Sequence, residues 1–196
     1  MISVIRLQYL QNRIAHHDDQ WAYQELFSQF YCSLTKFAFG LIKSKQSAEE
    51  VVSDVFMKIW EKRARLEQIE NLRVYLFVAT RNTALNYLDK QKKSCTINLD
   101  ELQAEPRCTY VDGEQMLVTA ELMLRIHREI DRLPPKCRTI FKLVKEDQLR
   151  YKEVAEILHV SVKTVENQLA IALRKIGAAV SFDIKRTILV SVASHP

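Results

Sequence analysis

Glycine and proline are scarce in this chain of 196 residues, which contains three glycines and four prolines. Glycine and proline mark the tight turns that connect strands, and a half-buried strand alternates apolar and polar side chains. No segment alternates in that way convincingly. We therefore predict an all-α fold. The glycines form no phosphate-binding loop either, because no glycine-rich motif is present.

Cysteine and histidine are also few, and none is arranged as a metal or catalytic site. The four cysteines are Cys32, Cys95, Cys108 and Cys137. They include no CxxC pair, and none lies beside a histidine at zinc-ligand spacing. We expect reduced thiols and no bound metal. Every candidate acid, histidine or cysteine lacks a partner at useful spacing. The sequence therefore predicts a protein that is not an enzyme and needs no cofactor or small-molecule substrate.

Long hydrophobic runs are missing near both ends of the chain. The opening residues carry Arg6 and Gln8 among apolar side chains, which is unlike a signal peptide. The apolar run over residues 188–193 is far shorter than the ~20 residues that cross a bilayer. We expect a cytoplasmic protein.

Charge is unevenly distributed along the chain, whose formal net charge is +5. Residues 1–93 carry 14 Lys and Arg against 10 Asp and Glu, and residues 117–196 carry 14 against 9. Between them, residues 94–116 carry one Arg against five acids. Such an acidic strip cannot lie on DNA, whereas the basic lobes permit phosphate contacts. We predict two helical domains, 1–93 and 117–182, joined by an acidic linker and followed by a tail, 183–196.

The strongest motif is a pair of short amphipathic helices between Tyr151 and Ile176. Apolar side chains recur at helical spacing on both sides of a break at residues 159–161, which has the length of a helix-turn-helix corner. Ser161 can cap the second helix, which would start near Val162. With Val162, Val165 and Leu169 inward, an outer surface of amide, cationic and small groups results: Lys163, Thr164, Glu166, Asn167, Gln168, Ala170, Ile171 and Arg174.

Amide and cationic side chains on a short helix suit a major groove, because they bond adenine and guanine edges or phosphates. An ordinary helical hairpin with a solvated face is the alternative. Two positions depart from the usual pattern. His159 stands where a glycine would turn the chain without steric cost, and Arg150 stands where a capping serine is expected.

The remaining helices are predicted from their apolar spacing. Residues 1–15 are expected to form a packing or frayed arm. A helix over residues 117–133 should stop at Pro134 and Pro135, which pre-set the next helix start. The helix over residues 19–42 has a broad apolar side that indicates core: Trp21, Leu26, Phe30, Leu34, Phe37 and Leu41.

A helix beginning at Ser47 presents two contrasting faces. Ser47 and Glu50 have the spacing of a capping box. One face is apolar: Val52, Val55, Phe56 and Ile59. The opposite face carries a carboxylate ridge that ends in a methionine, and is a plausible docking surface for another helix: Glu50, Ser53, Asp54 and Met57.

Residues 71–93 form a helix in which aromatic rings are interleaved with cations and amides. Rings can stack on unpaired bases, cations can bind phosphates and amides can bond base edges, so this helix suits a single-stranded nucleic acid. We expect Phe77 to be core. The other candidates are Arg73, Tyr75, Arg81, Asn82, Asn86, Tyr87 and Lys90.

These segments resemble known families. SVKTVENQL resembles the DNA-binding helix of quorum-sensing-type response regulators. The longer run over residues 133–176 resembles the second conserved domain of extracytoplasmic-function (ECF) sigma factors of bacterial RNA polymerase. SAEEVVSDVFMKIWEKR followed by ENLRVYLFVATRNTALNYLDKQKK resembles the first conserved domain of the same family.

The ECF resemblance implies roles for individual residues. In that family the first helix grips the clamp helices of the polymerase largest subunit, and the second melts the −10 promoter element, while the helix-turn-helix reads the −35 element. Residues 61–70 would help to hold a flipped promoter base, and the acidic linker would follow the RNA channel. The residues facing polymerase would be Glu50, Ser53, Asp54, Met57 and Lys58, with Ser53 where the family usually has Gln. Arg81, Asn82, Asn86 and Tyr87 fall in the melting segment, with Asn86 where Asp is more usual.

The partners that the resemblance implies are core RNA polymerase, promoter DNA and a membrane-anchored anti-sigma factor. The VENQ stretch is similar to iron-transport-type sigma factors of Bacteroidetes. The alternative is a free-standing helix-turn-helix regulator of response-regulator type. That alternative requires a receiver domain built from alternating strands and helices, and the sequence shows no such alternation.

Overall fold

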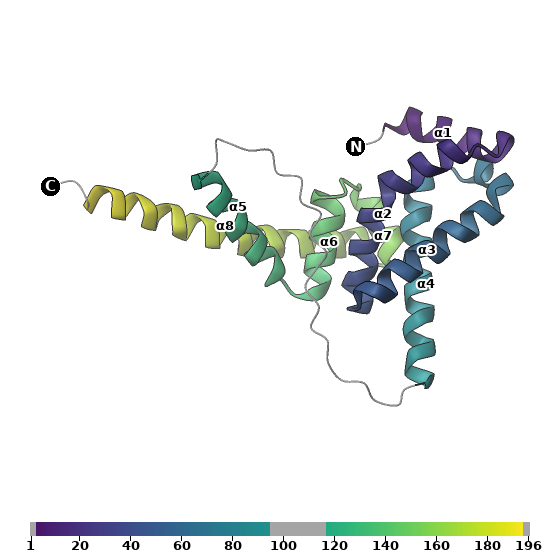
Figure 1. The fold of residues 1–196 in the computed structure, drawn as a ribbon. Coiled ribbons are helices and arrows are strands. Elements are labelled where there is room, and N and C mark those ends of the chain that lie inside the picture. The colour runs from purple at the N-terminus through teal and green to yellow at the C-terminus, as the bar shows by residue number, and fades with distance from the viewer. Residues whose placement is uncertain (1–2, 95–116, 194–196) are drawn as a thin grey trace. The chain divides into compact units, whose positions relative to one another are not determined.

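The computed structural model describes residues 3–94 and 117–193, which contain helices and no strand (Figure 1). The prediction of an all-α fold is confirmed. The chain divides into two compact units, each treated below by itself. The predicted acidic linker, apart from Ser94, lies outside the described residues, as does the role inferred for it.

The first unit is a bundle built around α2 (Gln20–Ile42). This helix packs against α1 (Val4–His17), α3 (Lys45–Glu61) and α4 (Leu72–Ser94), and a 3-10 helix, η1 (Arg63–Gln68), joins α3 to α4 (Figure 1). The innermost side chains come from all three longer helices: Leu26, Leu34, Phe56, Leu76 and Phe77. The ring of Phe77 meets that of Phe37 edge to face at 5.4 Å, so Phe77 is core, as predicted.

Local capping explains where α2 begins. The Asp19 carboxylate accepts hydrogen bonds from the amides of Trp21 and Ala22, at 3.0 and 3.1 Å. The helix predicted over residues 19–42 is therefore confirmed. Trp21 is not part of its apolar side, since its side chain is 82% exposed. Ala22 and Leu26 take the inward positions of the first turns instead.

The start of α3 differs from the prediction. Ser44, not Ser47, is the cap, and its hydroxyl accepts a hydrogen bond from the Ser47 amide. Ser47 is buried inside the helix and its hydroxyl bonds that of Tyr87, at 2.8 Å. The predicted capping box is wrong because a serine three residues earlier offers the helix an earlier start.

The arm predicted at the N-terminus is packed. Leu10 and Ile14 of α1 are fully buried, and the helix lies against both α2 and η1. Asp18 ends α1 in the left-handed region, where Asp is better tolerated than most residues. This arrangement places the N-terminal helix beside the segment between α3 and α4.

The second unit contains α5 (Leu117–Asp131), α6 (Pro135–Lys145), residues 151–155 of α7 (Tyr151–Leu158) and α8 (Val162–Ala193). As predicted, Pro134 and Pro135 separate α5 from α6, with Pro135 in the first position of α6. Both α5 and α6 pack against α8. Buried side chains from several elements form the core: Leu133, Cys137, Ile140, Leu143, Val154 and Val165.

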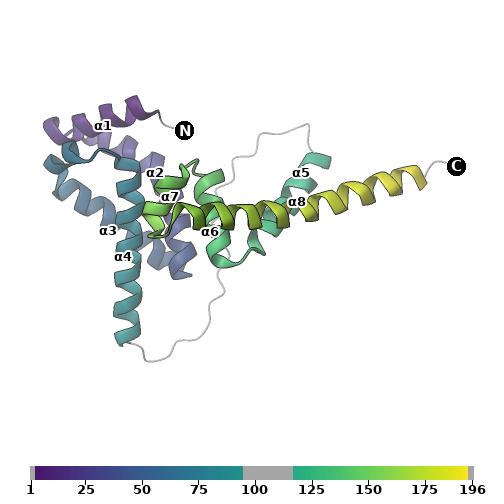
Figure 2. The same ribbon diagram turned by 180° about the vertical axis from the view of Figure 1, so that it is seen from behind.

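The helix α8 is longer than the short helix that the sequence predicted. It runs for 32 residues, through Gly177 and across the predicted tail boundary at residue 182 (Figure 2). No proline interrupts it, and an interior glycine costs only about 1 kcal/mol relative to alanine. Gly177 therefore does not end the helix.

The cysteines differ from one another. Cys32 of α2 is disulfide-bonded, so the expectation of a reduced thiol is wrong for this residue. Cys137 is free and buried, and its thiol donates to the Gln168 carbonyl at 3.1 Å. Among the described residues there is no group of three or more metal-ligating side chains, and no helix is long and apolar enough to cross a membrane.

We predict that the charge of Asp19 stabilises the first unit in a pH-dependent way. Hydrogen bonds from the Ala22 amide and the Arg13 guanidinium hold the pKa of Asp19 below its ordinary value of 3.8. A depressed pKa contributes stability above the ordinary value, and the contribution is lost as pH falls through the folded value. Asp19→Asn keeps a capping group without the charge. Its Tm should therefore fall below wild type at about pH 7, and the difference should vanish near about pH 2. A difference that is constant across this range would contradict the prediction.

Candidate functional site

The predicted ridge on α3 is exposed along its whole length. Its five side chains follow one another at helical spacing on the face opposite the buried stripe: Glu50, Ser53, Asp54, Met57 and Lys58. Met57 is 58% exposed, which is unusual for a large apolar side chain at the centre of a charged face. The predicted buried stripe, Val52, Val55, Phe56 and Ile59, is confirmed.

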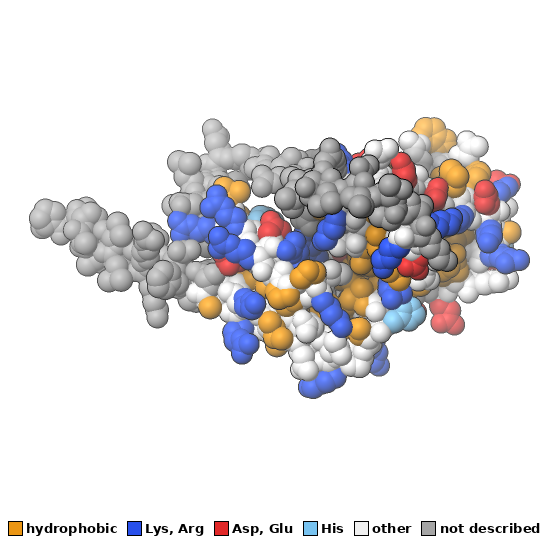
Figure 3. Space-filling view, turned by 90° about the horizontal axis from the view of Figure 1, so that it is seen from below, with side chains coloured by type: hydrophobic (Ala, Val, Ile, Leu, Met, Phe, Trp, Pro, Cys, Tyr) orange, Lys and Arg blue, Asp and Glu red, His pale blue; other side chains and the backbone are white. Residues whose placement is uncertain are grey.

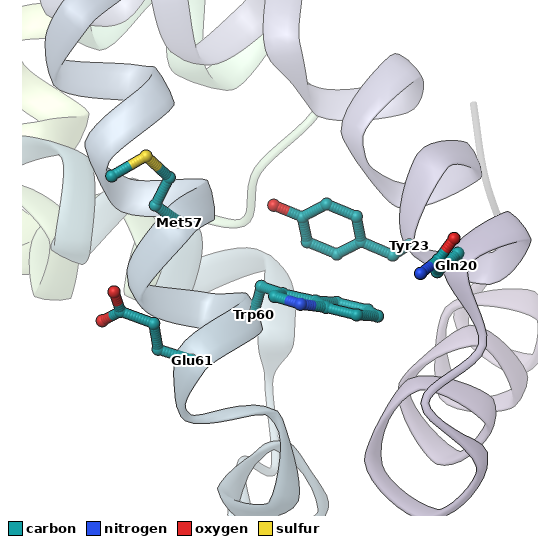
Figure 4. Close-up of a pocket in the computed structure, with 5 residues that line it drawn as sticks. All are labelled: Gln20, Tyr23, Met57, Trp60 and Glu61. Atoms are coloured by element: carbon teal, nitrogen blue, oxygen red, sulfur yellow. The ribbon is translucent and has the colours of Figure 1, made fainter.

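A recess beside Met57 was not predicted. A cavity of about 430 Å³ lies between α2 and α3, lined by Gln20, Tyr23, Met57, Trp60 and Glu61 (Figure 4). The rings of Tyr23 and Trp60 lie 4.9 Å apart. The Tyr23 hydroxyl donates to the Phe56 carbonyl at 2.9 Å, and burial raises the pKa of this phenol above its ordinary value.

The recess was missed because its aromatic walls come from two helices that are distant in sequence. One local signal could have indicated it, since Trp60 follows Met57 by one helical turn on α3. The ridge thus combines carboxylates with an apolar hollow able to receive a side chain of a docked partner.

The predicted melting residues of α4 fall into two groups. Tyr75, Asn82, Asn86 and Lys90 are all exposed and share one face at helical spacing, and the Tyr75 ring is 41% exposed. These four supply a ring, two amides and a cation to one stripe. The remaining three are half-buried on the other side of the helix: Arg73, Arg81 and Tyr87.

Tyr87 is held by another helix. Its hydroxyl bonds the buried Ser47 hydroxyl at 2.8 Å, which ties α4 to α3. The structure therefore gives the phenol a structural partner, and does not bring this ring together with Tyr75.

The segment predicted to hold a flipped base is folded as η1. Leu66 is 2% exposed and anchors it, whereas Arg65, Glu67 and Gln68 point to solvent. Asn71 follows, and its side-chain oxygen caps α4 by accepting from the Val74 amide at 3.2 Å. The exposed side chains of η1 thus directly precede the helix that bears the stripe.

The helix-turn-helix corner forms as predicted. The Ser161 hydroxyl accepts from the Thr164 amide at 3.0 Å, and α8 begins at Val162. Val165 and Leu169 are buried, but Val162 is 36% exposed, because it occupies the first position of the helix at the rim of the unit. The inward placement predicted for Val162 is therefore wrong.

The outer face of α8 agrees with the predicted one. Lys163, Glu166, Asn167, Ala170 and Arg174 are exposed, and Lys163 pairs with Glu166 at 3.3 Å. The other three residues of the predicted surface are half-buried: Thr164, Gln168 and Ile171.

The two departures from the usual motif are accommodated locally. His159 adopts the left-handed conformation with φ of 51°, and the Val160 amide closes the turn onto the Ala155 carbonyl at 3.0 Å. The Arg150 amide, which no serine caps, donates to the Glu153 carboxylate at 2.7 Å. This contact is the second half of a capping box, so α7 starts without its first half.

Basic side chains are dispersed over the surface. On the face shown in Figure 3, Lys and Arg lie among neutral and hydrophobic groups. In the second unit, exposed cations accompany the outer face of α8 and its neighbour α7: Lys152, Lys163, Arg174 and Lys175. Such cations can bind phosphates on both sides of a groove.

Comparison with known proteins gives matches to two parts of one family. Residues 26–94 match Sigma-70 region 2, and residues 123–176 match Sigma-70 region 4.

The chain is distantly similar in sequence to named bacterial sigma factors. The chain is 22% identical to the RNA polymerase sigma factor YlaC of Bacillus subtilis (strain 168) over 146 residues, which is 74% of this chain and 84% of that protein. It is 22% identical over 158 residues to the ECF RNA polymerase sigma factor SigW of the same organism, covering 77% and 84%.

The fold is similar to that of a solved sigma factor. The sigma factor RpoE of Bartonella quintana, solved in complex with the anti-sigma factor NepR, superimposes with a TM-score of 0.58 at 20% identity. The match covers 82% of this chain and 98% of that one.

We predict that the Tyr87 hydroxyl contributes to stability. Tyr87→Phe removes the bond to Ser47 while keeping the ring, and should lower the free energy of unfolding by about 1 kcal/mol in chemical denaturation. Tyr75→Phe, at an exposed ring on the same helix, is the matched control and should change it by less than about 0.5 kcal/mol. Equal effects of the two substitutions would contradict the structural role of Tyr87.

Proposed function

The chain belongs to the ECF-type sigma-70 family of RNA polymerase sigma factors, and we propose how its surfaces divide the work of promoter-specific initiation. The first unit docks on core polymerase through α3 and opens the −10 element with α4. The second unit reads the −35 element as intact duplex through α8.

One observation carries the proposal: regions 2 and 4 occur in this order in one chain, over residues 26–94 and 123–176. A free-standing helix-turn-helix regulator needs only the second. A receiver domain also requires strands, and residues 3–94 and 117–193 contain none. The regulator is therefore not favoured.

The ridge of α3 is the proposed polymerase-docking surface. Its acids, Glu50 and Asp54, require a basic partner surface, since complementary charges direct association and set its register. Met57 and the recess that Tyr23 and Trp60 line add the apolar surface that a specific interface needs. Ser53, which is smaller than the Gln usual in the family, is exposed on the same face.

The exposed stripe of α4 is the proposed surface for unpaired DNA. The Tyr75 ring offers a face on which a base can stack, Asn82 and Asn86 offer amides to base edges, and Lys90 offers a charge to a phosphate. Arg73, Arg81 and Tyr87 lie on the half-buried side, so we assign them to holding the helix in place.

The outer face of α8 is the proposed duplex-reading surface. Asn167 and Gln168 carry amides that can pair bidentately with adenine, and Lys163 and Arg174 can bond guanine or phosphate. Ala170 and Ile171 leave room for thymine methyl groups. The burial of Val165 and Leu169 fixes the rotation of the helix, and with it the set of side chains that enters the groove.

The proposed partners are core RNA polymerase, promoter DNA and an anti-sigma factor. The similar fold of RpoE, which was solved with an anti-sigma factor, supports the last of these. Membership of the iron-transport-type subgroup of Bacteroidetes stays a prediction that rests on the VENQ stretch alone.

In vitro transcription with purified core polymerase tests the function. The chain should direct transcripts from a subset of genomic promoters. Asp54→Arg reverses a charge on the ridge and should weaken binding to core polymerase about tenfold or more. Gln24→Arg introduces the same guanidinium on the exposed side of α2 without removing a carboxylate, and is the control. The absence of any promoter-dependent transcript would contradict the proposed function. Equal binding of the two variants to core polymerase would show that the ridge is not the docking surface.

Asn167→Ala tests the duplex-reading surface. Loss of a bidentate amide should cost about 1–3 kcal/mol at one base pair. Measured on upstream elements changed one pair at a time, the variant should lose discrimination at a single position and keep it elsewhere. A uniform loss of affinity for all sequences would show that Asn167 contacts only the DNA backbone.

A further inference from the structure

The N-terminal helix α1 is fastened to the segment between α3 and α4 by a buried amide. Gln11 is 6% exposed, and its amide nitrogen donates to the carbonyls of Leu66 and Ile69, the latter at 2.7 Å. The Leu66 carbonyl also accepts from the Ile69 amide at 2.9 Å, which closes the last turn of η1. One side chain of α1 therefore holds the end of η1.

The beginning of η1 is tied to the same helix. The Arg63 guanidinium bonds the carboxylate of Asp18, the residue that ends α1, and lies over the Trp60 ring at 4.9 Å. Between these ties, Arg65 and Gln68 point to solvent. The segment is thus held at both ends by α1, and Glu67 in its middle lies 3.4 Å from His16 of the same helix, which leaves Arg65 and Gln68 available.

A 3-10 helix has poorly aligned hydrogen bonds and needs help to keep one shape. A segment that is ordered before DNA arrives does not lose conformational entropy at the moment of binding, which strengthens binding without any new contact. Without Gln11, the carbonyls of Leu66 and Ile69 would need water as a hydrogen-bond donor, and the entry of water would loosen the turn.

Packing alone does not explain a glutamine at this position. Leu10 and Ile14 already supply the buried apolar surface of α1, and an apolar residue between them would avoid the cost of burying an amide. The part of the chain that matches Sigma-70 region 2 begins at residue 26, so α1 lies outside it.

We propose that α1 is a positioning element for strand opening, and that Gln11 is a positioning residue that holds residues 63–69 in the shape that receives an unpaired promoter base. The inference rests on the proposed function and on the role that the ECF resemblance implies for residues 61–70, which is to help hold a flipped promoter base. It adds that capture depends on a helix that lies outside the segment receiving the base and outside the part that matches Sigma-70 region 2.

The test uses holoenzyme and a fluorescent single strand that carries the downstream element of a promoter transcribed by wild type. The strand is intact or has one abasic site, which is moved through the element. For wild type, removal of the captured base should weaken binding about tenfold, as loss of one stacked base does. Gln11→Met keeps the side-chain length but has no donor, and it should bind the intact strand about tenfold more weakly.

The decisive result is the coupling between the two changes. Gln11→Met should be nearly insensitive to the abasic site at the captured position, while retaining wild-type sensitivity at other positions. Gln8→Met, the same substitution on the exposed side of α1, should behave as wild type. Full sensitivity of Gln11→Met at the captured position would overturn the inference.

Asp18→Asn provides a second variant in case Gln11→Met folds poorly. Asn tolerates the left-handed backbone at residue 18, whose φ is 50°, so the end of α1 is kept while the ion pair to Arg63 is lost. Asp18→Asn should reduce the effect of an abasic site at the captured position about twofold. An effect equal to that of wild type would overturn the inference. If wild type is insensitive at every position, base capture itself fails, which removes the proposed function along with this inference.

Discussion

The packing of α2 against α3 and α4 is the constraint on which the first unit depends. Phe56 and Phe77 are almost completely buried against this helix, together with Leu34. Because a helix that buries one face must present the opposite one, this packing turns the ridge of α3 and the stripe of α4 outward at the same time. The Tyr87–Ser47 hydrogen bond then fixes α4 against α3. The proposed docking surface and the proposed strand-opening surface are thereby held in one bundle.

In the second unit, too, the burial of one helix face determines which face is exposed, here on α8, the helix proposed to read duplex DNA. Val165 and Leu169 are buried, and they determine which side chains of α8 face outward. His159 adopts a left-handed backbone in the corner, and α7 begins with only the Glu153 half of a capping box. The two units differ in what they offer: α4 presents a ring with amides, which suits unpaired bases, whereas α8 presents amides and cations without rings, which suits base edges in a groove.

Much of this could be predicted from the sequence because helical periodicity reports burial directly. The ridge of α3, the outer face of α8, the Ser161 cap and the stop at Pro134 and Pro135 all follow from local spacing and capping chemistry. What could not be predicted depends on contacts between distant segments. The recess needs Tyr23 and Trp60 from two helices, and the fastening of η1 needs Gln11 of α1. Tyr87 and Tyr75 look equivalent in sequence, and only the packing of α4 separates them.

The central claim is that the first unit handles unpaired bases while the second holds intact duplex. Photo-crosslinking of holoenzyme on promoter DNA tests it most directly, with the crosslinker placed at residue 86 or at residue 167 in separate proteins. The account predicts that residue 86 crosslinks to the downstream element only once the strands have opened. Residue 167 should crosslink to upstream duplex both before and after opening. Crosslinks from residue 86 to closed duplex, or from residue 167 to the opened segment, would contradict the account.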